Sequence, residues 1–265
     1  MPDDSGYLLD NRAAGTGTRL AALAAIFDPT TFRHLDALGL GEGWRCWEVG
    51  AGGASVVRWL AQRVGAGGRV VATDVDVAWI DKAVGPNVEV LVHDVGRDAP
   101  PVRGFDLVHA RLVLVHVARR DQALASMVQA LRPGGWLVVE DADPALQPLS
   151  SLDPRSAEEE LANKLRTGFR ALLAERGVDL AYGRKLPRLL RDAGLIDVAA
   201  DAYLPMAIPE CALLEETTIG LVRDQLVGRH VATDAEIDEH LRNVTAGRLD
   251  LAQPPMVSAW GRVPA

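Results

Sequence analysis

Three acidic residues stand at the ends of successive apolar segments, and a glycine-rich turn follows the first of them. The turn is Glu48-Val49-Gly50-Ala51-Gly52-Gly53-Ala54-Ser55, and Asp74 and Asp94 end the next two segments. Glycine lets the backbone turn sharply and approach a ligand without a Cβ in the way. A carboxylate at the second position can accept hydrogen bonds from both ribose hydroxyls, and one at the third can accept from the exocyclic amine of adenine.

Each of these features also has a structural explanation. Glycine turns are common between strands and helices, and Ser55 departs from the last glycine of the dinucleotide pattern G-x-G-x-x-G. An acid after a strand can cap the next helix, but Asp76 fits that role better and leaves Asp74 for a ligand. Three acids at one edge of a sheet are more specific than any one alone, and together they favour a nucleotide-like ligand.

These acids share an edge only if the segments form a parallel sheet covered by helices, and the hydrophobic pattern predicts this α/β class. Short runs rich in Val, Leu and Trp are bounded by Gly, Pro or Asp, and they alternate with amphipathic stretches. The expected strands are 44–49, 69–74, 88–93, 105–110, 135–141, 196–204 and 255–263. The expected helices are 54–64, 76–84, 119–131, 155–177, 186–193, and 210–247 with a break near residue 228.

The segments around this core have their own start and stop signals. Residues 11–39 predict two helices, the second with Asp28 as its N-cap and Pro29 at its first position. The sequence Pro133-Gly134-Gly135 predicts a helix stop and a tight turn into the fifth strand. We expect a single domain in three parts: an N-terminal helical lid (1–40), a ligand-binding core (41–143), and the remaining strands with helical insertions that roof a pocket (144–265).

Composition excludes several classes of protein. The chain has 28 basic and 36 acidic residues and a net charge of −8, which argues against nucleic acid as a partner. Cys46 and Cys211 are the only cysteines, so neither a disulfide scaffold nor a cysteine-based zinc site is expected. Residues 1–10 do not resemble a signal peptide, and no apolar run is long enough to span a membrane. We expect a soluble cytoplasmic protein.

The motifs in their order resemble those of class I S-adenosylmethionine-dependent methyltransferases, over about residues 7–141. The segments that carry the resemblance are Glu48-Val49-Gly50-Ala51-Gly52, Asp74, His93-Asp94-Val95, Phe105-Asp106-Leu107-Val108-His109-Ala110-Arg111 and Leu131-Arg132-Pro133-Gly134-Gly135-Trp136-Leu137. The resemblance implies a Rossmann-like, doubly wound sheet of seven strands in the order 3-2-1-4-5-7-6, with the seventh antiparallel and with helical lid insertions. It also implies S-adenosyl-L-methionine as cofactor and a small-molecule acceptor, since the last turn is typical of small-molecule members.

The resemblance assigns roles to particular residues. It implies that the methionine moiety and ribose lie along the glycine turn, that the ribose hydroxyls bind the acid after the second strand, and that adenine lies beyond it. It also implies a carbonyl for the methionine ammonium just past the fourth strand, an acid that organises the turn, and an N-terminal tyrosine and arginine over the cofactor. In the order of these roles, the residues are Gly50, Ala51 and Gly52 for the turn; Asp74 for the ribose hydroxyls; Val75, Asp94 and Val95 for adenine; Ala110, with Arg111 beside it, for the carbonyl; Glu48 for the organising acid; and Tyr7 and Arg19.

Methyl transfer from a sulfonium is an in-line displacement that needs alignment and a dry pocket, and a base only if the acceptor loses a proton. His116, after the fourth strand, is the candidate base because its ordinary pKa suits the task; the alternative is a structural role. Asp141 and Asp143 are expected on the acceptor side. Metal-dependent relatives that methylate catechols carry an acid after the fourth strand, where this chain has Ala110-Arg111, so no metal is expected.

Two alternatives stay open at this stage. A nicotinamide-dependent oxidoreductase shares the glycine turn, but it does not predict Asp94 or the Pro-Gly-Gly turn. A methyltransferase-like protein that binds S-adenosylmethionine and catalyses cyclisation or decarboxylation would have the same cofactor motifs. The favoured acceptor is a small, fairly apolar metabolite, such as a secondary metabolite, and a homodimer is left open.

Overall fold

The computed structural model describes residues 8–9, 15–80 and 84–265. By their internal contacts these residues divide into two compact units. The sheet unit comprises residues 27–142, 181–203 and 256–265, and the helical unit comprises the described residues up to 26 together with 143–180 and 204–255.

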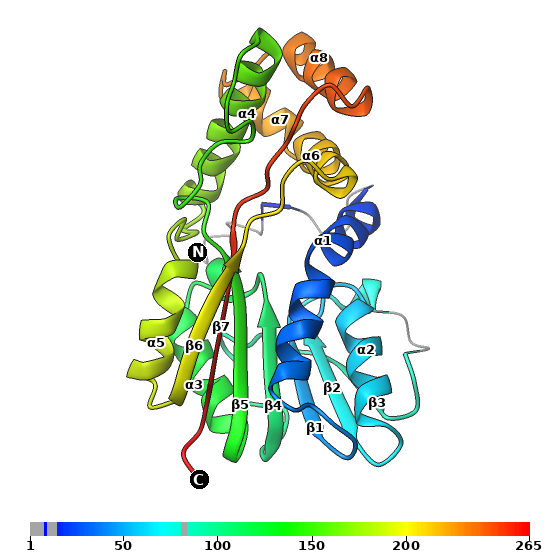
Figure 1. Cartoon of the computed structure of the whole chain (residues 1–265), viewed down its shortest axis with the longest axis vertical. Coiled ribbons are helices and arrows are strands. Elements are labelled where there is room, and N and C mark those ends of the chain that lie inside the picture. Colours follow the sequence, from blue (N-terminus) through cyan, green and yellow to red (C-terminus); the bar gives the residue numbers. More distant parts are fainter. Residues whose placement is uncertain (1–7, 10–14, 81–83) are drawn as a thin grey trace. The chain divides into compact units, whose positions relative to one another are not determined.

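Seven strands of the described chain form the sheet, in the order β3-β2-β1-β4-β5-β7-β6 (Figure 1). Strand β7 runs antiparallel to both of its neighbours, and the other adjacent pairs are parallel. This confirms the expected order and the antiparallel seventh strand. The strands are β1 (Arg45–Val49), β2 (Arg69–Asp74), β3 (Val88–Val92), β4 (Phe105–Arg111), β5 (Leu131–Ala142), β6 (Ile196–Tyr203) and β7 (Met256–Arg262).

Helices cover both faces of the sheet, which is why the central parallel strands are buried over most of their length. The second half of α1 (Thr16–Ala37) and α2 (Ser55–Val64) pack on the face that carries Cys46. The opposite face receives α3 (Arg120–Ala130) and α5 (Leu186–Asp192). Three short 3-10 turns complete the unit: η1 (Val77–Trp79), η2 (Leu114–His116) and η3 (Gly183–Lys185).

The helical unit has its own core and a buried charged centre. Arg166 donates to Glu215 at 2.9 Å, and the Nε2 atom of His240 lies 3.2 Å from the same carboxylate, all three side chains being buried. Although burial alone would raise it, the pKa of Glu215 is lowered to about 2 by the charge of Arg166 and the hydrogen bond to His240. The helices are α4 (Ala157–Glu175), α6 (Pro209–Leu221), α7 (Arg223–Gly228) and α8 (Asp234–Thr245).

The prediction of two helices before β1 is wrong. A single helix, α1, runs from Thr16 to Ala37 with Pro29 inside it. A proline in a helix removes one backbone hydrogen bond, and that loss can be offset by packing. Here Phe32 stacks on Trp59 with ring centroids 4.4 Å apart. The carboxylate of Asp28 does not cap a new helix, because it accepts hydrogen bonds from Arg111 and Ser55.

The helix predicted over residues 76–84 is present only as the short turn η1. Asp76 is its N-cap, as expected, and its carboxylate accepts from the backbone N–H of Ala78 at 3.0 Å. The chain leaves the turn at Ile80 in an extended conformation, and residues 81–83 lie outside the described residues. None of the helices in the described part of the chain has both the length and the apolar character of a membrane span.

The sequence predicted a tight turn at Pro133-Gly134-Gly135 before the fifth strand. In the structure this segment lies within β5, near its start, and forms a bulge. Leu131 pairs with Phe105, and the next pair is Trp136 with Leu107, so four residues bulge out of register. The backbone of Gly135 lies against β4 so closely that a Cβ there would be 2.8 Å from the carbonyl oxygen of Phe105. This close approach requires glycine.

We predict that Gly135→Ala destabilises the protein by about 1–3 kcal/mol, because the new methyl group overlaps a backbone carbonyl that cannot move without breaking the sheet. The Gly67→Ala variant is the matched control, since a Cβ at Gly67 meets nothing within 4 Å. Urea denaturation of both variants measures the effect. Equal denaturation midpoints for the two variants would contradict this account of the bulge.

Candidate functional site

The carboxyl ends of β1, β2 and β4 meet at one edge of the sheet, because β1 lies between the other two and pairs in parallel with both. Val49 at the end of β1 is in register with Thr73 of β2 and with Ala110 of β4. The strand order reverses direction between β1 and β4 (Figure 1). In open α/β sheets this reversal opens a crevice at the carboxyl ends, where ligands bind.

The glycine turn that follows β1 has the conformation that its residues predict. Gly50 and Gly52 have φ angles of +63° and +52°, which side-chain-bearing residues rarely adopt. A Cβ on Gly50 would lie 2.3 Å from a methyl group of Val113. The close approach that excludes a Cβ at Gly50 is therefore to Val113 of the same chain. Helix α2 begins after Ala54, which has no side-chain cap, so its first-turn N–H groups form a local site for negative charge.

Asp74 ties this turn to the end of β2. One of its carboxylate oxygens accepts from the backbone N–H of Gly52 and the other from that of Asp76, each at 2.9 Å. Asp76 is the N-cap of η1, as expected, and Asp74 is not used as a cap. A carboxylate has about four acceptor positions, however, so about one on each oxygen remains for a ligand.

The third acid and its apolar neighbours follow the same edge. Asp94 comes after β3 and accepts from the backbone N–H of Gly96 at 2.9 Å, while Arg97 lies 3.4 Å from its other oxygen. Val95 is buried, whereas Val75, next to Asp74, is 64% exposed. An exposed valine beside two carboxylates offers an apolar contact surface next to hydrogen-bond acceptors.

The end of β4 differs from expectation at two residues. Ala110 lies inside the strand, between Val49 and Val139, and not just past it. Arg111 is the last residue of β4, and its guanidinium donates to Asp28 at 2.8 Å and to Thr31 at 3.0 Å. Its side chain thus holds α1 against the sheet.

The candidate base and the two acids expected on the acceptor side do not all belong to the same unit. His116 is half-buried at the end of η2. Asp141 is completely buried beneath that turn and accepts from the backbone N–H of Val115 at 3.3 Å, and burial raises the pKa of its carboxyl well above the ordinary value. The expectation that Asp141 lies on the acceptor side stays a prediction. Asp143 belongs to the helical unit and is also buried.

A row of charged side chains lies between α1 and the sheet, buried except at its last member, and sequence reasoning missed it. We call it the charge row: Glu48, His109, Glu140, His34 and Asp201. Its carboxylates and imidazoles alternate, with separations of 2.7, 3.4, 3.2 and 3.0 Å in that order. The sequence signal that could have revealed the charge row is an ionisable residue inside each of three apolar strands: Glu48, His109 and Glu140.

Of the expected cofactor residues, one belongs to the helical unit and one lies outside the described residues. Arg19 lies on α1, in the part of that helix that belongs to the helical unit. Tyr7 lies outside the described residues. The described residues contain no group of three or more His, Cys, Asp or Glu side chains that could hold a metal ion.

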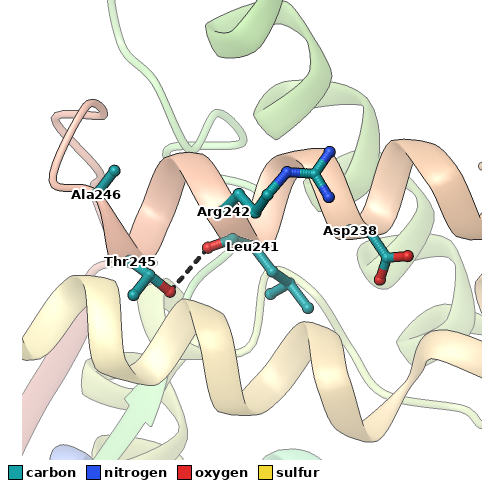
Figure 2. Close-up of a pocket in the computed structure, with 5 residues that line it drawn as sticks. All are labelled: Asp238, Leu241, Arg242, Thr245 and Ala246. Atoms are coloured by element: carbon teal, nitrogen blue, oxygen red, sulfur yellow. Dashed lines mark hydrogen bonds between the residues drawn. The ribbon is translucent and has the colours of Figure 1, made fainter.

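A groove of about 470 Å³ lies on the surface of α8 in the helical unit (Figure 2). Thr245 donates to the carbonyl oxygen of Leu241 at 2.9 Å within it. None of the residues that sequence reasoning assigned to the site lines this groove. Its lining residues are Asp238, Leu241, Arg242, Thr245 and Ala246.

Comparison with known proteins matches residues 47–139 to the family model described as a methyltransferase domain. A curated relative, the methyltransferase str2 of Strobilurus tenacellus, is 30% identical over 205 residues, which cover 74% of this chain and 70% of the relative. The ubiquinone/menaquinone biosynthesis C-methyltransferase of Pseudomonas paraeruginosa is 30% identical over 40% of this chain and 44% of the relative. The chain thus spans less than half of that enzyme's length.

Solved structures show the same fold. The phosphoethanolamine N-methyltransferase 2 of Haemonchus contortus, in complex with S-adenosyl-L-methionine, aligns with a TM-score of 0.61 and 17% identity over 100% of this chain and 62% of that one. The YcgJ protein of Bacillus subtilis aligns with a TM-score of 0.54 and 13% identity over 88% and 97% of the two chains. With the sheet order, the domain match and a relative similar over most of its length, the chain belongs to the class I S-adenosylmethionine-dependent methyltransferases.

Proposed function

We propose that the chain binds S-adenosyl-L-methionine at the carboxyl edge of its sheet and transfers the methyl group to a small, fairly apolar metabolite. The observation that carries this proposal is the carboxylate of Asp74. It is fixed by the backbone N–H groups of Gly52 and Asp76, and it keeps acceptor capacity for the two ribose hydroxyls. Asp74 ends β2, at the same edge of the sheet where the strand order reverses between β1 and β4.

The other contacts to the cofactor follow from the same edge. We assign the methionine moiety to the turn at Gly50, Ala51 and Gly52, whose conformation Glu48 supports from the end of β1. The adenine ring is assigned to the exposed face of Val75, and its edge to Asp94 and Val95. The remaining residues of the proposed cofactor site are Ala110, Arg111, Tyr7 and Arg19.

The bound cofactor would supply an electrophilic methyl group on a positively charged sulfur. The contribution of the protein is to align donor and acceptor and to exclude water, since the positive charge disperses as the methyl group leaves. Orientation of this kind can supply up to about 7–11 kcal/mol of a reaction barrier. No nucleophilic side chain is needed for such a displacement.

Two observations support a small acceptor. The net charge of −8 disfavours nucleic acid, and the matched relatives carry names that specify quinone biosynthesis and phosphoethanolamine methylation. We propose that the helical unit supplies residues that bind the acceptor, as expected for the insertions within 144–265. A place in secondary metabolism and a cytoplasmic location belong to the same proposal.

We propose His116 as the general base for acceptors that lose a proton. It ends η2, directly after the strand whose end forms part of the proposed cofactor site. Asp141 holds the backbone of that turn from below, through the N–H of Val115. Histidine is the side chain that most often serves as a general base, and His116 is half-buried.

We predict that Asp74→Asn weakens binding of S-adenosylhomocysteine about 10- to 100-fold, the effect of losing hydrogen bonds to a charged acceptor. Isothermal titration calorimetry measures the affinity. Asp121→Asn, an exposed carboxylate in the first turn of α3, is the matched control and should bind as the wild type does. Equal affinity of the Asp74→Asn and control variants would remove Asp74 from the site.

We predict that methyl-labelled cofactor incubated with the protein and a panel of phenols, quinols and amines delivers the label to an acceptor. The assay follows the label by mass spectrometry, with the cofactor-binding variant Asp74→Asn as the negative control. A label that stays on the cofactor while an acceptor cyclises or loses carbon dioxide would instead identify an enzyme that uses the cofactor without transferring its methyl group.

For an acceptor that loses a proton, we predict that His116→Asn lowers kcat about 100-fold or more, the usual contribution of a general base. The limb of the pH–rate profile that rises with pH should disappear in the variant, whereas cofactor affinity should stay unchanged. Turnover within about threefold of the wild type would eliminate His116 as the base.

A further inference from the structure

We propose that His109 is a positioning residue for cofactor binding, acting through Glu48, and that the charge row fastens the cofactor turn to α1. The inference rests on the proposed function, because it concerns how the same turn is held. It assigns a role to His109, Glu140 and His34, to which the family resemblance assigned none.

Strand register places the charge row on one face of the sheet. Glu48 is paired with His109 across β1 and β4. Glu140 on β5 is paired with Ser258 on β7, which is in turn paired with Asp201 on β6. Because His109 lies in register with Val138, two residues before Glu140, it faces the same side as that glutamate. The row therefore crosses five strands on the face that α1 covers.

The two histidines face carboxylates with both of their ring nitrogens. In His109, Nδ1 lies 2.7 Å from Glu48 and Nε2 lies 3.4 Å from Glu140. In His34, Nδ1 lies 3.2 Å from Glu140 and Nε2 lies 3.0 Å from Asp201. A neutral imidazole can donate from only one nitrogen, so His109 satisfies both glutamates only as a cation, whereas Nε2 of His34 also lies 3.1 Å from a guanidinium nitrogen of Arg33.

Charge balance explains why such a row can be buried. The side chains of Glu48, His109 and Glu140 are between 0% and 3% exposed, and a buried charge is tolerated only beside opposite charge and hydrogen-bond donors. Glu140 meets this condition fully. Besides the two imidazoles, it accepts from Thr31 on α1 and from Ser258 on β7 at 2.7 Å.

The charged neighbours of the row hold the imidazoles in their cationic form. Burial alone would lower the pKa of His109, but the charge of Glu48 and the hydrogen bonds to both glutamates raise it to about 9. The pKa of His34 is raised for the same reason, against burial, by Glu140 and Asp201. Two further cations border the row: Arg33 donates to Asp201 at 3.0 Å, and Arg111 donates to Thr31.

Glu48 connects this row to the cofactor turn. Glu48 lies two residues before Gly50. The turn itself is held to β2 by a backbone hydrogen bond from the N–H of Ala51 to the carbonyl of Thr73. Loss of the His109 cation leaves the carboxylate of Glu48 buried without its charged partner. The carboxylate must then take up a proton or move, and movement displaces the turn.

The sign of the pH dependence follows from the raised pKa. The cation of His109 is present at and below neutral pH and is lost as the pH rises through about 9. The affinity for the cofactor should therefore be constant near neutral pH and should fall above it. The cofactor's own amino group also titrates at alkaline pH. The pH dependence of affinity must therefore be compared with that of a variant that binds the same ligand but lacks the His109 imidazole.

The experiment is calorimetric titration of S-adenosylhomocysteine into the full chain between pH 6.5 and 10, for the wild type, His109→Gln and Glu48→Gln. We expect His109→Gln to bind S-adenosylhomocysteine at least about tenfold more weakly than the wild type at pH 7.5. In the wild type, affinity should fall at alkaline pH by more than titration of the ligand explains, and this additional fall should be absent in His109→Gln. His240→Gln is the matched control. His240 is also buried and also lies beside a glutamate, Glu215, but it belongs to the helical unit and lies outside the charge row.

A double-mutant cycle separates positioning through Glu48 from a general loss of stability. If His109 acts through Glu48, His109→Gln should have little further effect on affinity in the Glu48→Gln background. Additive effects, or equal affinities and parallel pH profiles for wild type and His109→Gln, would overturn the inference while leaving the proposed function intact. Failure of the wild type to bind at any pH would overturn the proposed function and this inference with it.

Should His109→Gln not fold, Glu48→Gln tests the inference by itself. The neutral amide then removes the charge that His109 requires, so the variant should bind more weakly and lack the same alkaline component. Wild-type affinity and an unchanged pH profile in Glu48→Gln would count against the inference.

Discussion

Parallel pairing of β1 with β2 on one side and β4 on the other is the constraint on which the proposed site depends. The register of Val49 with Thr73 and Ala110 brings three strand ends to one level. It places the glycine turn, Asp74 and the end of β4 beside one another, although about 60 residues of sequence separate the first from the last. The contacts that we assign to the glycine turn, Asp74 and the end of β4 depend on this pairing, and Asp94 and Val95 follow β3, which pairs with β2.

The same register forces polar side chains into the core. Strand positions alternate between faces, so Glu48, His109 and Glu140 lie beneath α1, where the row of opposite charges makes their burial tolerable. On the opposite face Asp141 meets η2, and burial shifts the pKa of its carboxyl upward because fewer donors compensate it. Adjacent residues of one strand thus have opposite electrostatic environments.

Local backbone geometry links the site to the elements around it. Leu112 has a φ angle of +57°, a conformation that costs about 1–2 kcal/mol for a residue with a side chain. The residue after it, Val113, packs against the Cα of Gly50. The glycine turn and η2, which ends at His116, are therefore in direct contact, and the strained leucine is part of the connection between them.

The sequence alone determined the α/β class, the seven strands and the acids at their ends, because apolar periodicity, glycine turns and strand-end carboxylates are local signals. Local signals also misled: Asp28 and Pro29 have the form of a helix start, yet the contacts of Asp28 with Arg111 and of Phe32 with Trp59 continue α1 through the proline. Only the tertiary structure decided the partners of His109, Glu140 and His34. Those partners come from five strands and a helix, and no spacing in the sequence encodes which buried charge meets which.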